Sequence, residues 1–106
     1  MEIKHSQTVN DGQFSLYEND NLIGYIKYEW AKNGNIKAVG TFVDESKRGQ
    51  NLGEVLFDEL LEFTEQNDVK IYPICPYIVK VFNDHPELNE FLDEEYLESL
   101  KSDEEE

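Results

Sequence analysis

The chain is short of cysteine, of basic residues and of long apolar runs. Its single cysteine, Cys75, cannot form an internal disulfide, which fits a reducing cytoplasm. No apolar stretch approaches the roughly 20 residues that cross a bilayer, and the first residues lack the basic-then-apolar layout of a signal peptide. We therefore expect a cytoplasmic protein with no membrane segment.

The shortage of basic residues also limits the class of partner. Nine lysines and arginines stand against 24 acids, a formal net charge of −15. A nucleic-acid-binding protein would show a basic patch, so that class is set aside. The acidic excess serves solubility, or it attracts a cationic acceptor such as an amine. Because the same excess repels polyanions, the adjacent Lys47 and Arg48, the latter the only arginine, are informative.

Metal-binding patterns are absent as well. No group of cysteines and histidines has zinc spacing, and Asn19-Asp20-Asn21 is too short for a calcium loop. We expect no metal site.

The rest of the composition is that of one globular domain. With 106 residues and 39% hydrophobic side chains, a single packed core is expected over residues 1–100. Residues 101–106 are too charged to pack and are expected to be disordered.

Alternating apolar and polar residues predict strands over 13–17, 22–30 and 36–43. The Asn33-Gly34 pair is a strong hairpin signal, so these strands should form an antiparallel meander. Residues 1–12 look like a polar lead-in with a turn at 10–12, in which His5 has no evident role.

Helical spacing of apolar residues runs from Leu52 to about Gln66, and a strand is predicted over 69–74. A strand, a helix and a further strand imply a right-handed crossover and parallel pairing. Pro73 cannot donate to a ladder, which favours strands that splay apart at their C-terminal ends. Further helices should begin at Pro76 and beyond residue 87. The fold class is therefore mixed α/β, an antiparallel meander continuing into a splayed parallel pair, with helices packed on the sheet.

The loop between the third strand and the helix is the strongest functional signal. It contains Gly49, Gly53 and Asn51, and asparagine also tolerates a left-handed backbone. A helix N-terminus leaves backbone N–H groups unpaired, and with the helix dipole they favour an anion, usually a phosphate.

The order Val43, four polar residues, then Arg48-Gly49-Gln50-Asn51-Leu52-Gly53 resembles the pyrophosphate-binding segment of the GNAT superfamily of acetyl-CoA-dependent N-acetyltransferases. The departure is Asn51, where that segment commonly has glycine. A second motif, residues 72–78 followed by 83–87, resembles a group of minimal single-domain GNAT proteins called NATD or YjdJ-like. The resemblance extends from about residue 13 to residue 87.

The resemblance implies acetyl-CoA lying in the gap between the splayed strands, with its thioester near Cys75. It also implies an amine acceptor, either a small molecule or an amine on a protein. The expected coenzyme-binding residues are Thr41, Phe42, Val43, Lys47, Arg48, Gly49, Gln50, Asn51, Leu52, Gly53, Phe82 and Asn83.

Cys75 has two interpretations. At a helix N-terminus its thiol is a candidate nucleophile that carries the acetyl group, and it is equally a small buried hydrophobe. The resembling group commonly has a histidine before Thr-x-Val, where this chain has Gly40, so a thiol–imidazole pair is absent. Other candidates for a general base are Glu29, Asp44, Glu45, Tyr28 and Tyr72.

Three functional classes follow from these observations. The first is an N-acetyltransferase, the second a non-catalytic acyl-CoA-binding module, and the third a small α/β domain whose loop binds no nucleotide. Coenzyme binding separates the third from the others.

Overall fold

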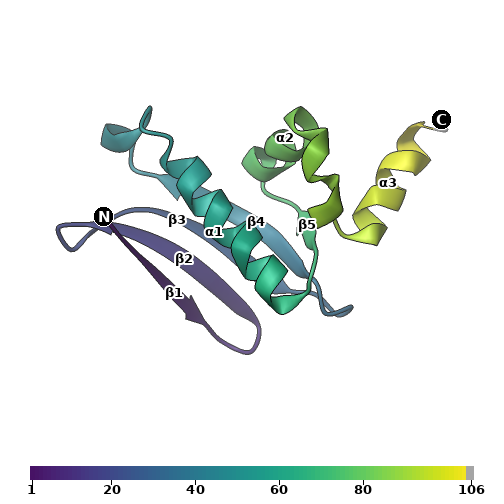
Figure 1. Ribbon diagram of the computed structural model, residues 1–106, viewed down its shortest axis with the longest axis horizontal. Helices are drawn as coiled ribbons and strands as arrows, with labels where there is room; N and C mark the ends of the chain where they lie inside the picture. Colours follow the sequence, from purple (N-terminus) through teal and green to yellow (C-terminus); the bar gives the residue numbers. More distant parts are fainter. Residues whose placement is uncertain (105–106) are drawn as a thin grey trace.

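The computed structural model describes residues 1–104, which form one five-stranded mixed sheet with helices packed against it (Figure 1). The strands lie side by side in chain order, β1-β2-β3-β4-β5. The elements are β1 (Glu2–Gln7), β2 (Asp11–Glu18), β3 (Asn21–Trp30), β4 (Ile36–Val43), η1 (Glu45–Lys47), α1 (Leu52–Asn67), β5 (Ile71–Pro73), α2 (Pro76–Asp84), η2 (Pro86–Phe91) and α3 (Glu94–Glu104).

The predicted meander is confirmed, with β2, β3 and β4 paired antiparallel. A two-residue turn joins β2 to β3, and both of its residues, Asn19 (φ 51°) and Asp20 (φ 66°), are left-handed. Such turns match the right-handed twist of the flanking strands. The β3–β4 loop spans residues 31–35. In its Asn-Gly pair only Gly34 has a positive φ (90°).

The first strand, β1, was not predicted. It pairs antiparallel with β2 at one edge of the sheet, and its sequence is polar except for Ile3. His5 is not idle there: its ring stacks on Phe14 at 4.1 Å between centroids, and its Nε2 lies 2.7 Å from the Tyr28 hydroxyl. Burial lowers the pKa of His5, and burial together with the charge of Asp11 raises the pKa of Tyr28 to about 12.

The main helix, α1, has nearly the predicted bounds and packs across β2, β3 and β4. Helix α2 lies beside it on the same face, with the rings of Phe57 and Phe82 at 5.5 Å in an edge-on contact. The core between these helices and the sheet includes the fully buried Ile26, Tyr28, Ile36, Ala38, Leu56, Leu60, Ile71 and Ile78.

The parallel pair of β4 and β5 is short and then opens, as the sequence predicts. The pairing covers Ile36–Ala38 against Ile71–Pro73. The carbonyl of Ala38 then accepts from the N–H groups of both Ile74 and Cys75, at 2.9 Å each. Val39 is the extra residue of a β-bulge against β3, and bulges bend a strand. Within the part of the chain that the structure describes, β4 has no strand partner on this side from residue 39 to residue 43.

Helix α3 packs against β5 through Tyr96 and Tyr72, whose ring centroids are 5.2 Å apart. It continues to Glu104 and so includes residues 101–104 of the segment expected to be disordered. Residues 105–106 of that segment lie outside the described residues.

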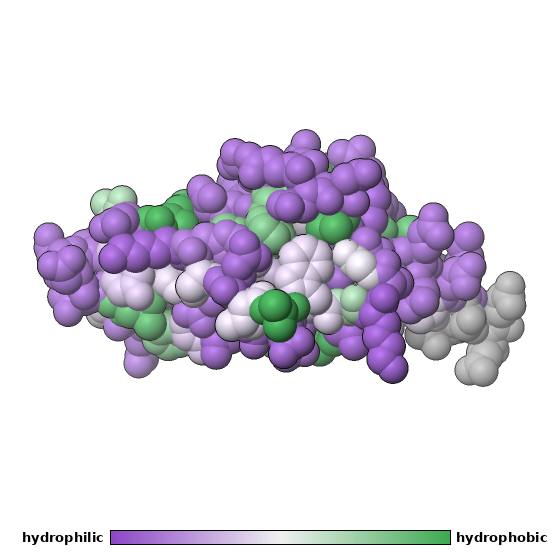
Figure 2. All heavy atoms as spheres, turned by 90° about the horizontal axis from the view of Figure 1, so that it is seen from below, coloured by the Kyte–Doolittle hydropathy of each residue, from purple (hydrophilic) through white to green (hydrophobic). Residues whose placement is uncertain are grey.

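Seen from below, the surface is mostly hydrophilic and its apolar side chains form small separate groups (Figure 2). None of the helices in residues 1–104 has the length and apolar character needed to span a membrane.

Candidate functional site

The glycine-rich loop is anchored at its start. The Asp44 N–H donates to the Ile23 carbonyl of β3 at 2.7 Å, and the Asp44 carboxylate accepts from the N–H and hydroxyl of Ser46. These bonds from Ser46 lower the pKa of Asp44. They fix the short helix η1, so Lys47 at its end and Arg48 directly after it stand on backbone of defined geometry.

Two left-handed residues, Gly49 (φ 90°) and Asn51 (φ 60°), turn the chain into α1. The first backbone bond at this helix end runs from Val55 N–H to the Asn51 carbonyl, and the Asn51 side chain makes no capping bond. Within residues 1–104, the N–H groups of residues 51–54 therefore have no hydrogen-bond acceptor. They stand at the positive end of a 16-residue helix, which is the arrangement that binds anions.

These residues border a cavity of about 330 Å³ between the loop, β4 and α2. Eight of the twelve residues expected from the sequence line it, and Tyr77 joins them. The lining consists of Thr41, Val43, Lys47, Arg48, Gly49, Asn51, Leu52, Gly53 and Tyr77. The unpaired stretch of β4 and the free amides of α1 thus share one hollow.

Four expected residues lie elsewhere. Phe42 points to the opposite face of the sheet, where it stacks on Tyr25 at 5.4 Å. Phe82 is buried against Phe57, while Gln50 and Asn83 are exposed and do not line the cavity.

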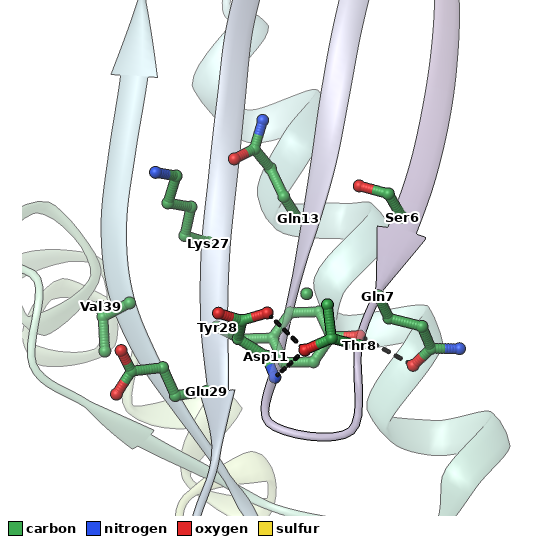
Figure 3. A pocket seen from close by; sticks show the side chains of 10 residues that line it. Ser6, Gln7, Thr8, Asp11, Gln13, Lys27, Tyr28, Glu29 and Val39 are labelled. Atoms are coloured by element: carbon green, nitrogen blue, oxygen red, sulfur yellow. Dashed lines mark hydrogen bonds between the residues drawn. The ribbon is translucent and has the colours of Figure 1, made fainter.

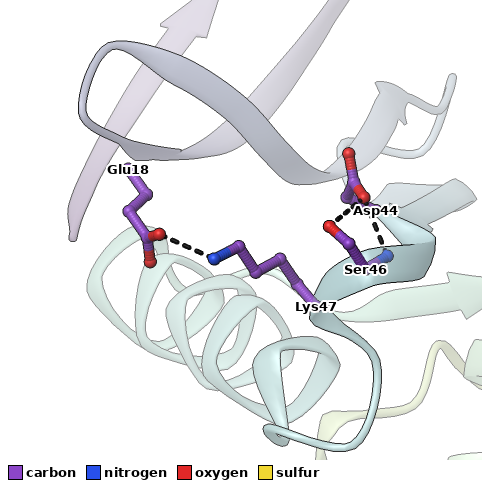
Figure 4. A network of polar contacts seen from close by, with 4 residues as sticks. All are labelled: Glu18, Asp44, Ser46 and Lys47. Atoms are coloured by element: carbon purple, nitrogen blue, oxygen red, sulfur yellow. Dashed lines mark hydrogen bonds and ion pairs between the residues drawn. The ribbon is translucent and has the colours of Figure 1, made fainter.

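The two cations of the loop differ in their surroundings. Lys47 Nζ lies 2.7 Å from a carboxylate oxygen of Glu18, at the end of β2 (Figure 4). Arg48 is exposed and has no ion-pair partner among the described residues.

Tyr77, in the first turn of α2, is the member of the cavity wall that the sequence did not single out. Its hydroxyl approaches α1 so closely that a Cβ on Gly53 would lie 2.7 Å from it. Burial, with smaller contributions from Glu54 and Cys75, raises the pKa of Tyr77. At neutral pH its protonated hydroxyl is a hydrogen-bond donor at the cavity wall.

Cys75 is 8% exposed and is the N-cap residue of α2. Its sulfur lies 3.7 Å from the hydroxyl of Thr41, a residue of the cavity wall. No imidazole accompanies it: His5 lies in the aromatic cluster with Phe14, and His85 pairs with Glu87 at 3.4 Å. A Cβ on Gly40 would meet nothing within 4 Å.

Among the candidate bases, Tyr28 is buried with His5, and Tyr72 packs on Tyr96. Glu29 borders a different hollow of about 360 Å³ (Figure 3). That hollow lies on the sheet face opposite α1, because Gln13, Lys27 and Glu29 alternate with residues buried under α1. Its carboxylates and the absence of a helix end there make it unsuited to a phosphate.

The described residues include no group of three or more His, Cys, Asp or Glu side chains placed to hold a metal ion.

Comparison with known proteins shows the family. A model of the family described as GCN5-related N-acetyl-transferase matches residues 13–91, most of the chain. The chain belongs to this family. Whether it falls in the NATD or YjdJ-like group stays a prediction.

A solved structure supports the fold of this acetyltransferase-family chain. It is similar to the ribosomal-protein-alanine N-acetyltransferase of Brucella melitensis biovar Abortus 2308, with a TM-score of 0.59 and 17% identity. The match covers 74% of this chain and 66% of that one, slightly less than two thirds of its length. A search of curated proteins found no match.

Proposed function

We propose that this chain binds acetyl-CoA in the loop cavity and transfers its acetyl group to an amine. The observation that carries the proposal is the set of amides at residues 51–54, unpaired within residues 1–104, of which residues 51–53 line a cavity that the unpaired edge of β4 also borders. The diphosphate lies on the N–H groups of the loop beside Arg48. The pantetheine arm runs along residues 40–43 of β4 like an added strand, and the thioester points toward Cys75.

In the reaction the amine nitrogen attacks the thioester carbonyl carbon. A new C–N bond forms and the C–S bond breaks, so coenzyme A leaves as a thiolate. The Tyr77 side chain borders the same cavity, and we assign its hydroxyl as the donor that protonates that thiolate. The incoming ammonium loses its proton to water or to a carboxylate of the acidic surface.

A second candidate, a non-catalytic acyl-CoA-binding module, is favoured by one observation. Gly40 stands where the resembling group has histidine, and no imidazole replaces it beside Cys75. Direct transfer to an amine does not need that pair, whereas acetylation of Cys75 would lack the base that the pair supplies. The absence of the imidazole thus lowers the case for a cysteine intermediate more than the case for transfer.

Titration of the protein with acetyl-CoA, followed by heat or by amide chemical shifts, tests binding. We expect the largest shifts at residues 48–54, and no change at millimolar ligand would contradict both candidates. A panel of amines with a thiol-release readout then separates enzyme from binding module. Mass spectrometry should show an added acetyl group, about 42 Da, on Cys75 only if the thiol is a nucleophile. Turnover intact in Cys75→Ala would indicate direct transfer.

A further inference from the structure

The loop has two neighbouring cations, and only one is available to a phosphate. We propose that Glu18 limits the affinity for coenzyme A by holding the ammonium of Lys47, which leaves Arg48 as the only uncompensated side-chain cation at the site. This inference rests on the proposed coenzyme site and concerns how tightly that site holds its ligand.

The geometry of the pair is close and protected. Lys47 Nζ and the Glu18 carboxylate are 2.7 Å apart, with the two side chains 27% and 33% exposed. An ion pair partly withdrawn from water is less screened by salt than one on the open surface.

Both partners stand on ordered backbone, so no loop has to be ordered for the pair to form and the cost is limited to side-chain rotamer freedom. Glu18 is the last residue of β2, directly before the tight turn at Asn19 and Asp20. Lys47 ends η1, and its N–H donates to the Asp44 carbonyl at 2.8 Å. Asp44 is in turn tied to Ile23 of β3, so the two side chains meet without further rearrangement (Figure 4).

This arrangement works against a bound phosphate in two ways. A phosphate that recruits Lys47 must first displace the Glu18 carboxylate. The displaced carboxylate then remains as an unpaired negative charge next to a negatively charged ligand. A coenzyme that must leave after each transfer is released more readily from a site weakened in this way.

The test replaces the carboxylate by its neutral isostere, Glu18→Gln, and measures the dissociation constant of coenzyme A by calorimetry at two salt concentrations. We expect affinity to rise about 3-fold to 10-fold at low salt, because a repulsive charge is lost and a cation is released. The affinity of the variant for coenzyme A should also fall more steeply with rising salt concentration than that of the wild type.

The matched control is Glu45→Gln, which removes the same charge from the glycine-rich loop itself. Glu45 lies in η1, is exposed and has no ion pair within the described residues. We expect it to change affinity by less than about 2-fold. An equal rise in both variants would reduce the effect to net charge and overturn the proposal.

A second pair of variants tests whether the gain comes through Lys47. Lys47→Met should weaken binding by about 3-fold or more in the wild-type background, because it removes a cation and leaves the Glu18 carboxylate unpaired near the ligand. In the Glu18→Gln background the same change should remove most of the gain. If the Glu18→Gln protein has the melting temperature of the wild type but an equal or lower affinity for coenzyme A, Glu18 does not limit that affinity. If the wild type itself binds no coenzyme A, the proposed function fails too, so the two failures are distinguishable.

Discussion

At the scale of single residues, the site depends on backbone groups more than on side chains. Four amides at the start of α1 are fixed by the fold, and among the described residues only Arg48 adds a positive charge without an ion-pair partner beside them. An acidic chain with so few cations must rely on dipoles that no pH change can remove. Its phosphate affinity should therefore be sensitive to one arginine and to the geometry of one glycine.

Arg48→Ala should weaken coenzyme A binding by about 1–3 kcal/mol, the usual value of a hydrogen bond to a charged group. Calorimetry measures it directly. Lys80→Ala is the control, because Lys80 pairs with Asp84 on α2 and does not line the cavity. Equal affinity in Arg48→Ala and the wild type would mean that the loop does not hold the phosphates.

Gly53→Ala should weaken coenzyme binding by roughly tenfold, or 1.4 kcal/mol, with little change in stability. The added Cβ would lie 2.7 Å from the Tyr77 hydroxyl and push the ring aside. Alanine is the better helix former by about 1 kcal/mol, which offsets the cost of that shift to folding.

The comparison for that variant is the same change in a Tyr77→Phe background. Without the hydroxyl, the nearest ring carbon would lie 3.1 Å from the added Cβ, so Gly53→Ala should cost less coenzyme affinity in that background. Calorimetry checks the loss of coenzyme affinity, and denaturant unfolding checks that stability changes little. A stable Gly53→Ala protein with normal affinity would show that Tyr77 has no part in the site.

At the scale of elements, the sequence predicted the helices and strands whose apolar residues recur at a regular spacing. Helix α1 and strand β4 were found within a residue or two of their bounds because one apolar face repeats along each. Strand β1 was missed because an edge strand needs few apolar residues: Ile3 and His5 suffice to contact the rest. Strand β5 is shorter than predicted, since after Pro73 the next two amides share the Ala38 carbonyl.

The sequence predicted only the part of the candidate site whose residues are close together in the chain. Gly49 and Asn51 lie in the loop and Gly53 in the first turn of α1, and their spacing in the sequence indicates the conformation there. Tyr77 could not be found this way, because only the packing of α2 against α1 brings it to Gly53. Glu18 is 29 residues from Lys47, and no local pattern links them.

The buried Asp93 joins two elements and supports a prediction on stability. One oxygen of its carboxylate accepts from the side-chain amides of Asn33 (2.9 Å) and Asn35 (2.7 Å) in the β3–β4 loop. The other accepts from the backbone of Glu95 and Tyr96 at the start of α3. Burial opposes ionisation, but these four bonds outweigh it and lower the pKa of Asp93.

Asp93→Asn should therefore lower the free energy of unfolding at pH 7 by about 1.5–3 kcal/mol. A carboxyl whose folded pKa is depressed stabilises the protein above its unfolded pKa of about 4, and that contribution is lost as pH falls through the folded pKa. The gap between wild type and variant should then shrink toward pH 3 in urea titrations. A gap of constant size would mean that the charge of Asp93 does not contribute.

At the scale of the whole molecule, the formal net charge of −15 opposes the folded state. Folding brings like charges together, and mobile ions screen them. Sodium chloride raised from low concentration to about 0.5 M should therefore stabilise the protein at pH 7 by about 1 kcal/mol, or roughly 4–8 °C in Tm. The control is the same salt series near the sequence pI of 4.3, where the net charge vanishes and the salt effect should nearly vanish with it. A similar rise at both pH values would show a general effect of salt, and the acidic surface would then not limit stability. A rise confined to neutral pH would mean that the charge excess costs the fold a measurable part of its stability.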